Sequence, residues 1–309
     1  MRISAIIVTR NREHYLRKSL DSLINQELGR DDYEIIVVDN GSRDATAAIV
    51  REGQRVFPNL RYEYVAEEGS SRARNAGVAA ASAPIVAFLD DDAIAPPAWL
   101  QELLAVFGAH EPPPACVGGK ILPLWESAVP DWFPKRYLPS LSMLDMGDET
   151  ICLGPERYIV GANMALLKDE VLRVGGFNDD ISLYADEIYI QDKLRAMGEK
   201  VYYAPHAWVY HHVPAGRLTV EYLCNRKYRG GKGEVVVILE RKRGVEYIMY
   251  ISKNIVGRPF RIAYLYIVSI VSRVVGNKNV EIESMIQMSR SRGMMEQAAK
   301  IVKHRLMRV

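Results

Sequence analysis

The sequence predicts an α/β fold, with a three-layer domain on a mainly parallel mixed sheet followed by a basic helical C-terminal extension. Over the first ninety residues, short β-branched runs alternate with helical patterns, which is the sequence form of βαβ units. Beyond residue 216 the strand signals give way to helical spacing, and the sign of the charge changes. We therefore expect two regions, residues 1–215 and residues 216–309.

The elements of the first region follow from local patterns. Leu16, Leu20 and Leu23 recur at helical spacing, and comparable spacing predicts two more helices. Gly175-Gly176 is expected to end a later short helix. The predicted strands cover residues 3–8, 34–38, 60–65, 85–89, 115–122 and 158–165, and the predicted helices cover residues 15–26, 44–57, 71–81 and 168–174. The Pro- and Trp-rich stretch 111–148 is either a set of loops over a pocket or an ordinary surface insertion.

Charge divides the chain more sharply than composition does. Residues 216–309 carry 19 Lys and Arg against 7 Asp and Glu, a net charge of +12, which leaves −10 for residues 1–215 of a chain with net charge +2. A basic surface suggests contact with a membrane or an acidic partner, and no nucleic-acid motif accompanies it. Three cysteines without paired spacing favour a reducing cytoplasm, and the short apolar start does not resemble a signal segment.

The apolar run at residues 262–275 is flanked by Arg258 and Arg261. It is shorter than the roughly 20 apolar residues that a membrane span needs. We expect either a core helix packed on the α/β domain or a helix that lies at a membrane interface, with the core helix as the simpler interpretation.

Three consecutive carboxylates, Asp90-Asp91-Asp92, follow the wholly apolar strand at residues 85–89. Ligands of open α/β sheets bind at the carboxyl ends of strands. Because clustered carboxylates repel one another, a hard divalent cation, Mn²⁺ or Mg²⁺, is the expected occupant. The alternative is a cluster that caps the start of a helix.

Other strand ends converge on the same edge of the predicted sheet. Asp39 ends the second strand and can accept a hydrogen bond from a nucleobase or a ribose, although it can also form a simple Asx turn. Thr9, Arg10 and Asn11 follow the first strand. Together these residues predict a nucleotide pocket.

In these segments the sequence resembles glycosyltransferase family 2, the inverting nucleotide-diphospho-sugar transferases of the Rossmann-like GT-A fold. The resemblance covers roughly residues 3–215 in order, which makes it more specific than any single motif. Its segments are residues 6–12, 37–42, 72–77, 88–92 and 175–178, and the stretch from Tyr184 to Gly198.

The resemblance implies a role for most of these side chains. The nucleobase of the donor would be held by Thr9 and Asp39. The nucleotide would be approached by Arg74, and the ribose by Asp91. The metal that bridges to the diphosphate would be held by Asp92. Asp90 would support this strand end, while Gly161 and Asn163 would lie on the acceptor side of the sugar pocket.

An inverting transfer also needs a base to deprotonate the acceptor hydroxyl. Family members commonly carry Glu-Asp here with a further Asp two residues later, whereas this chain reads Asp186-Glu187 followed by Tyr189. Glu187 matches the base position, and Asp186 competes with it. The alternative is that both residues only cap a helix. His211 or His212 could complete the metal site, or could simply pack among aromatic residues.

These features together predict a metal-dependent, hexosyltransferase-like enzyme. It would move a sugar from a UDP-, dTDP- or GDP-sugar to a hydroxyl of a glycan or lipid-linked acceptor, in polysaccharide, lipid-linked glycan or glycoconjugate biosynthesis. The expected location is the cytoplasm, with peripheral contact to the inner face of the membrane through the basic C-terminal region. A nucleotidyltransferase is the rival enzyme class, but it would need a Gly-rich basic loop near the N-terminus, which this sequence lacks. A catalytically silent nucleotide-sugar-binding protein stays open because of the Asp186-Glu187 departure.

Overall fold

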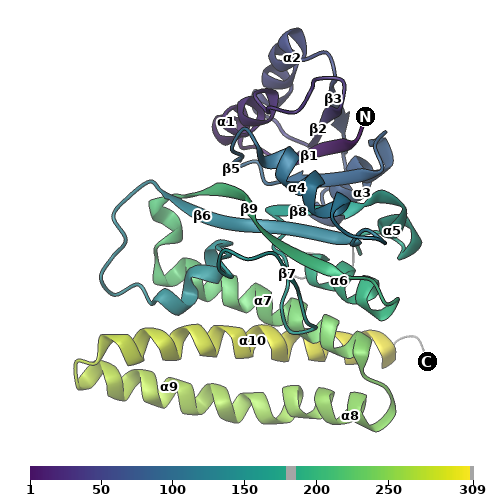
Figure 1. Cartoon of the computed structure of the whole chain (residues 1–309). Helices are drawn as coiled ribbons and strands as arrows, with labels where there is room; N and C mark the ends of the chain where they lie inside the picture. The colour runs from purple at the N-terminus through teal and green to yellow at the C-terminus, as the bar shows by residue number, and fades with distance from the viewer. Residues whose placement is uncertain (179–185, 307–309) are drawn as a thin grey trace. The chain divides into compact units, whose positions relative to one another are not determined.

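The computed structural model of the protein describes residues 1–178 and 186–306 and divides into two compact units (Figure 1). Residues 1–124, 142–178 and 186–212 form the first unit, and residues 125–141 and 213–306 form the second. The second unit therefore takes in a segment from the middle of the chain. The domain boundary expected at residue 215 stays a prediction.

Four parallel strands form one half of the sheet in the first unit. These strands are β1 (Ile3–Thr9), β2 (Tyr33–Asp39), β3 (Leu60–Tyr64) and β4 (Ile85–Leu89). β1 pairs with β2 and β4, and β2 pairs with β3, all in parallel. The connections run through helices α1 (Glu13–Ile24), α2 (Thr46–Val56) and α3 (Ser70–Ala80). The predicted βαβ units are confirmed.

Beyond β4 the sheet continues with an antiparallel half, where β8 (Asn163–Leu167) pairs antiparallel with β4 and with β6 (Cys116–Trp125). β9 (Val201–Val213) follows β6 and pairs antiparallel with the short strands β5 (Ala93–Ile94) and β7 (Ile151–Cys152). The described residues thus form a nine-stranded mixed sheet in the order β3-β2-β1-β4-β8-β6-β9-β5, with β7 beside β9. The remaining helices of this unit are α4 (Trp99–Gly108), α5 (Lys168–Arg173) and α6 (Asp186–Ala196).

Alternation along the strands explains the layers of the first unit. Ile6 and Val38 face α3, where a Cβ on Gly77 would lie 2.7 Å from Cγ2 of Ile6, so this glycine lets the helix approach the sheet. Successive strand side chains point to opposite faces, which leaves Ile7 and Val37 on the other face, towards α1 and α2. All four strand residues are buried. Helices thus flank the sheet on both faces, as the sequence predicted.

One predicted strand is partly wrong. The strand-like run at residues 158–165 becomes a strand only at Asn163, and Gly161 lies in a turn. A Cβ on Gly161 would come within 2.8 Å of the Arg74 guanidinium. The chain therefore turns where a charged side chain needs space, and the apolar pattern of the run gives no sign of this.

The second unit is helical. It contains the 3₁₀ segments η1 (Lys135–Leu141) and η3 (Ala215–Arg217), and the helices α7 (Val220–Arg241), α8 (Gly244–Ser252), η4 (Lys253–Gly257), α9 (Arg258–Val274) and α10 (Lys278–Leu306). α10 packs against both α7 and α9. A Cβ on Gly293 of α10 would lie 2.0 Å from the Tyr228 carbonyl oxygen, so this glycine allows α7 and α10 to approach closely. Val235, Ile251 and Met294 lie in the small core of this unit.

The segment 125–141 is tied to α10. The Tyr137 hydroxyl donates to the Glu283 carboxylate at 2.9 Å, and Arg136 pairs with the same carboxylate. The Lys227 ammonium lies 5.3 Å from the centre of the Tyr137 ring. The Pro- and Trp-rich stretch therefore belongs, at these residues, to the helical unit.

The interpretation of residues 262–275 as a core helix is wrong. α8, η4 and α9 form one continuous helical stretch of 31 residues, Gly244–Val274, which by length and composition alone could cross a membrane. Only 11% of its most apolar window is buried. The run is thus part of a longer helix than the sequence suggested, with most of its apolar side chains exposed.

A glycine on β6 provides a test of the packing of the sheet. A Cβ on Gly119 would lie 1.7 Å from the backbone oxygen of Ala207, so Gly119→Ala should lower the free energy of unfolding by about 2 kcal/mol or more. Gly108→Ala, at the end of α4 with nothing within 4 Å, is the control and should be neutral or slightly stabilising. Urea denaturation of both variants is the measurement. Equal midpoints would contradict the packing described for β6.

Candidate functional site

The acidic triplet is held between two strands. β4 ends at Leu89, and β5 begins at Ala93 and pairs there with His211 of β9. The backbone N–H of His212 donates to the Asp92 carbonyl at 2.9 Å, and the Ser19 hydroxyl donates to the Asp90 carbonyl at 3.2 Å. Because a strand follows the triplet, its interpretation as a helix cap is wrong.

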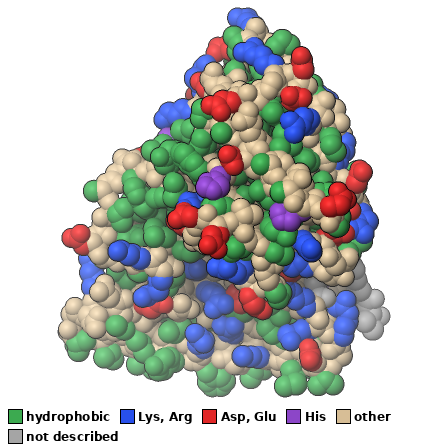
Figure 2. Space-filling model, in the orientation of Figure 1, with side chains coloured by type: hydrophobic (Ala, Val, Ile, Leu, Met, Phe, Trp, Pro, Cys, Tyr) green, Lys and Arg blue, Asp and Glu red, His purple; other side chains and the backbone are tan. Residues whose placement is uncertain are grey.

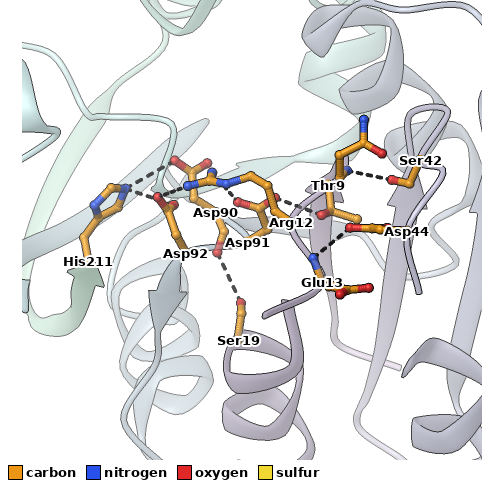
Figure 3. A network of polar contacts seen from close by, with 11 residues as sticks. Thr9, Arg12, Glu13, Ser19, Ser42, Asp44, Asp90, Asp91, Asp92 and His211 are labelled. Atoms are coloured by element: carbon orange, nitrogen blue, oxygen red, sulfur yellow. Dashed lines mark hydrogen bonds and ion pairs between the residues drawn. The ribbon is translucent and has the colours of Figure 1, made fainter. Parts of the chain in front are cut away.

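Asp90, Asp92 and His211 form a group that could hold a metal ion, with one ligand atom from each lying within 4.8 Å of the others (Figure 3). His211 Nε2 lies 3.2 Å from Asp92 Oδ1 and 3.7 Å from Asp90 Oδ2. Burial would lower the pKa of His211, but the two carboxylates outweigh it and raise the pKa to about 9. Two carboxylates and an imidazole suit a divalent ion such as Mn²⁺. The residues present therefore fit the expected cofactor.

Arg12 lies between the other carboxylates of the triplet. Its guanidinium donates to Asp91 Oδ1 and to Asp92 Oδ2, both at 2.6 Å (Figure 3). Burial would lower the pKa of Arg12, but the charges of Asp91 and Asp92 raise it instead. Arg12 lies within the segment that carries the family resemblance, yet it is not among the site residues predicted from the sequence. Its position three residues after β1 was the available signal.

Asp91 points towards β1 rather than into the metal group. Its Oδ2 accepts a hydrogen bond of 2.8 Å from the buried Thr9 hydroxyl. Burial raises the pKa of Asp91 to about 7; Arg12 opposes the rise, and the charge of Asp92 adds to it. The three carboxylates thus divide, because Asp90 and Asp92 face His211 while Asp91 faces Thr9. The sequence predicts Asp92 as the metal ligand, with His211 or His212 as a further ligand and Asp90 in a supporting role only.

Asp39 lies beside Thr9 in the register of β1 and β2. The Ser42 N–H donates to Asp39 Oδ1 at 2.7 Å, which is the expected turn, and the Tyr62 hydroxyl donates to Oδ2 at 2.6 Å. Burial and the Asp39 carboxylate raise the pKa of Tyr62 well above its usual range. Tyr62, from β3, is a further residue of this edge that sequence reasoning missed.

Arg10 and Asn11 shape the rim of this edge. Arg10 is exposed and pairs with Glu68. Asn11 has a φ of 51°, which places it in the left-handed region, and its N–H donates to Ser42 Oγ at 2.9 Å. Its side-chain oxygen accepts from the N–H of Arg43 at 2.8 Å. Asn11 therefore joins the turn after β1 to the turn after β2.

A second charged group comes from α3 and α6. The partly buried Arg74 guanidinium pairs with Asp186, which also accepts a hydrogen bond of 3.3 Å from the Ser71 hydroxyl. Burial would lower the pKa of Arg74, but the charges of Asp186, Glu187 and, more weakly, Asp90 raise it. Arg74 therefore interacts electrostatically with both α6 carboxylates and, through Asp90, with the acidic triplet.

The two carboxylates at the start of α6 differ in protonation. Burial raises the pKa of Glu187 to about 8, and the charge of Asp186 adds to the rise. Burial acts on Asp186 as well, but the charge of Arg74 and hydrogen bonds hold the pKa of Asp186 below its usual value. At neutral pH Asp186 is thus ionised while Glu187 is largely protonated. Tyr184, where the resembling segment begins, lies outside the described residues.

Two predicted residues are engaged elsewhere. The side chain of Asn163 accepts from Trp99 Nε1 at 2.9 Å and donates to the carbonyl of Ala207 at 2.7 Å, so it cross-links the core. The His212 ring packs against Tyr15 with centroids 5.1 Å apart. We therefore leave Asn163 and His212 out of the proposed site.

The fold and the site define an α/β protein with a nucleotide-type strand edge beside an Asp-Asp-His group. The sequence pattern of glycosyl transferase family 2 matches residues 4–174, more than half of the chain. The protein belongs to glycosyl transferase family 2.

The named relatives are glycosyltransferases. The chain is 28% identical to validoxylamine A glucosyltransferase of Streptomyces hygroscopicus subsp. limoneus over 67% of this chain and 50% of that protein. It is 24% identical to glucosyl-dolichyl phosphate glucuronosyltransferase of Haloferax volcanii over 77% of this chain and 78% of that protein. It thus spans about half the length of the first of these relatives. Membership of this family disfavours the nucleotidyltransferase alternative.

Two solved structures share the GT-A fold. The mannosyltransferase PcManGT from Pyrobaculum calidifontis, in complex with GDP-Man and Mn²⁺, has a TM-score of 0.65 and 19% identity, covering 96% of this chain and 86% of that one. S. aureus TarS 1–349 in complex with UDP has a TM-score of 0.56 and 15% identity, covering 94% and 91%. These similarities confirm the predicted fold.

Arg12 provides a test of the metal group that needs no donor. Its guanidinium lies on two carboxylates that a cation would also attract, so Arg12→Ala should bind Mn²⁺ about tenfold more tightly than the wild type. Titration calorimetry with Mn²⁺ alone is the measurement. Arg10→Ala is the control, because Arg10 pairs with Glu68 instead. A folded Arg12→Ala protein with unchanged or weaker Mn²⁺ affinity would rule out this competition.

Proposed function

We propose that this protein is an inverting, divalent-metal-dependent glycosyltransferase that moves a hexose-type sugar from a nucleoside diphosphate to a hydroxyl acceptor. The observation that carries the proposal is the position of Arg74. It pairs with Asp186 beside Glu187, and it also senses the charge of Asp90. The charges of a candidate base and of a candidate metal group therefore both act on Arg74, which supports placing them in one site.

The donor would lie along the carboxyl ends of β1, β2 and β4. We propose that Thr9 and Asp39 bind the nucleobase and that Asp91 binds the ribose. These three polar side chains are buried, Thr9 lies beside Asp39 in the register of β1 and β2, and Thr9 donates a hydrogen bond to Asp91. The structures of PcManGT with GDP-Man and TarS with UDP support a nucleoside-diphosphate donor. A thermal-shift panel of UDP, dTDP and GDP with Mn²⁺ would identify the base, since a bound ligand stabilises the fold by mass action.

We assign the metal to Asp90, Asp92 and His211, with Mn²⁺ or Mg²⁺ as the ion. When bound, such an ion neutralises the diphosphate and the charge that develops on the leaving group. His211 would have to lose its proton, and Arg12 would have to release Asp92, to make these atoms available. Arg12 would then be free to turn its guanidinium towards the phosphates.

Glu187 is a better candidate than Asp186 for the catalytic base that deprotonates the acceptor hydroxyl. The carboxylate of Asp186 is committed to Arg74 and Ser71, whereas Glu187 keeps part of its surface exposed. A pKa near 8 also suits proton transfer near neutral pH. In the transfer, the ionised Glu187 takes the proton of the acceptor hydroxyl as the acceptor oxygen bonds to the anomeric carbon. The bond from that carbon to the phosphate oxygen breaks, and its electron pair leaves with the nucleoside diphosphate.

Asp186 and Arg74 would position this base. The ion pair keeps Asp186 negative next to Glu187, which raises the pKa of Glu187 beyond the effect of burial. Arg74 in turn places a fixed positive charge near the start of α6. We therefore interpret the reversed acid order as a change of the acid at the base position, which Glu187 occupies, with Asp186 kept to orient it.

For the acceptor we propose a glycan or lipid-linked hydroxyl. Support comes from the named relatives, one of which is a glucosyl-dolichyl phosphate glucuronosyltransferase. The proposed sugar transfer would take place in the cytoplasm, at the inner face of the membrane, as a step of polysaccharide, lipid-linked glycan or glycoconjugate assembly. Free thiols at Cys116, Cys152 and Cys224 are consistent with a reducing compartment.

The metal assignment predicts a response to chelation. Donor hydrolysis or transfer should vanish with EDTA and return with Mn²⁺, and Asp92→Ala should lower kcat/KM by at least about 100-fold. Release of the nucleoside diphosphate is the measurement. Asp21→Ala, at an exposed position on α1, is the control and should keep full activity. Unimpaired turnover of Asp92→Ala would overturn the assignment.

The base assignment predicts both a variant and a pH profile. Glu187→Gln should bind the donor with wild-type affinity but transfer at least about 100-fold more slowly, because an amide cannot take a proton. Since the pKa of Glu187 is raised to about 8, its basic form grows with pH, and wild-type kcat/KM should rise up to pH 8 and then level off. Asp186→Asn, which leaves Arg74 without its charge partner, should also weaken folding, as thermal melting would report. If Glu187→Gln turns over normally, the base is not Glu187.

A further inference from the structure

The continuous helix Gly244–Val274 of the second unit exposes its apolar side, while polar side chains occupy much of its buried side. Apolar side chains recur on its exposed side at intervals of three or four residues, which forms one stripe along the helix. A helix on a water-facing surface normally shows the opposite arrangement. The exposed side chains are Val245, Ile248, Met249, Val256, Phe260, Tyr264, Tyr266, Ile267, Ile270, Val271 and Val274, here called the apolar stripe.

The side of this helix that is buried carries polar groups. Asn254, Ser269 and Ser272 are buried there. The Arg258 guanidinium donates to Asn254 Oδ1 at 3.0 Å and reaches Ser291 of α10 at 3.5 Å. Contacts within the unit therefore satisfy these polar side chains and bury Ile251, whereas most of the apolar side chains of the helix stay outside. The apolar stripe needs an apolar phase on its other side.

Basic residues accompany the apolar stripe. Residues 242–278 hold seven Lys and Arg against one acidic residue, Glu246. Arg243, Lys253 and Arg261 are exposed. Figure 2 shows apolar side chains gathered along the edge formed by α8 and α9, with Lys and Arg side chains beside them. Exposed tyrosines at positions 264 and 266 add the amphipathic rings that are enriched at membrane interfaces.

We propose that the apolar stripe docks the protein onto an anionic lipid bilayer, with the helix Gly244–Val274 lying in the plane of the membrane. A helix of 31 residues is about 46 Å long, enough for an extended contact in which its apolar side enters the headgroup region by about 5–10 Å. The seven basic residues of the stretch 242–278 complement the negative surface of such a membrane.

Two other arrangements fit these observations less well. A span across the bilayer would carry α10 with it, because α10 packs along α9 and bears charged residues such as Glu281, Glu283 and Arg290, which are costly in hydrocarbon. A twofold dimer through the apolar stripe would place the basic residues of one copy against those of the other, since such an interface uses the same patch twice. Charge therefore favours the anionic membrane over a second copy.

The test is cosedimentation with vesicles, and it needs neither donor nor acceptor, so it is independent of the proposed transferase activity. The wild type should bind phosphatidylcholine vesicles that contain about one-third phosphatidylglycerol, and raising the salt should weaken the binding. Phe260→Glu/Ile267→Glu should lower the partition coefficient at least about tenfold. Both side chains are exposed, so this variant should fold normally, which thermal melting can confirm. Leu172→Glu, an exposed apolar position on α5, is the matched control and should bind like the wild type.

A second variant tests the contribution of the basic residues to vesicle binding separately from that of the apolar stripe. Lys253→Gln/Arg261→Gln should reduce binding to the anionic vesicles about tenfold and leave weak binding to pure phosphatidylcholine unchanged. Sedimentation velocity in the absence of lipid supplies the remaining arm. The proposal is overturned if the wild type does not bind anionic vesicles or if the Glu variant binds them like the wild type. A wild-type dimer that the Glu variant dissociates, with vesicle binding unaffected, would assign the stripe to a second copy instead.

Discussion

The concentration of negative charge at the strand ends is the constraint on which the site depends. Asp91 and Asp92 are buried next to Asp90, an arrangement that is strongly unfavourable without cations close by. Arg12 comes from the loop after β1 and His211 from β9, so distant segments supply the compensating charge. A sheet with the wrong register would leave these carboxylates buried without partners. The acidic triplet is therefore stable only in the native register of the sheet, which brings Arg12 and His211 to its carboxylates.

Local patterns predicted the parallel half of the sheet because its strands are short β-branched runs with amphipathic helices between them. They also predicted that Thr9, Asp39 and the triplet would converge, since the ends of parallel strands share one edge. They could not show which carboxylates face His211 and which faces Thr9, because that depends on side-chain directions across the sheet. Arg12 was missed for the same reason, as its partners are about eighty residues away.

The C-terminal region shows a different limit. Helical spacing identified its helices, but apolar spacing alone does not tell whether a helix turns its apolar side inward or outward. The run at residues 262–275 is too short on its own to span a membrane, which left a core helix and an interfacial helix as interpretations, with the core helix the simpler one. Only the tertiary contacts show that Asn254, Ser269 and Ser272 take the inner side. The continuity of the helix through Lys253 was hidden as well, because a charge and a glycine interrupt the apolar run.

The segment 125–141 has a consequence for how such a chain can be divided. It leaves the first unit after β6 and is held in the second by Glu283 on α10, while the chain returns to the first unit at residue 142. The two units are therefore interleaved along the sequence rather than placed one after the other. A single recombination crossover cannot exchange the helical unit without splitting it. A gene fragment that stops near residue 215 would encode a protein that keeps this segment but lacks the helices that hold it.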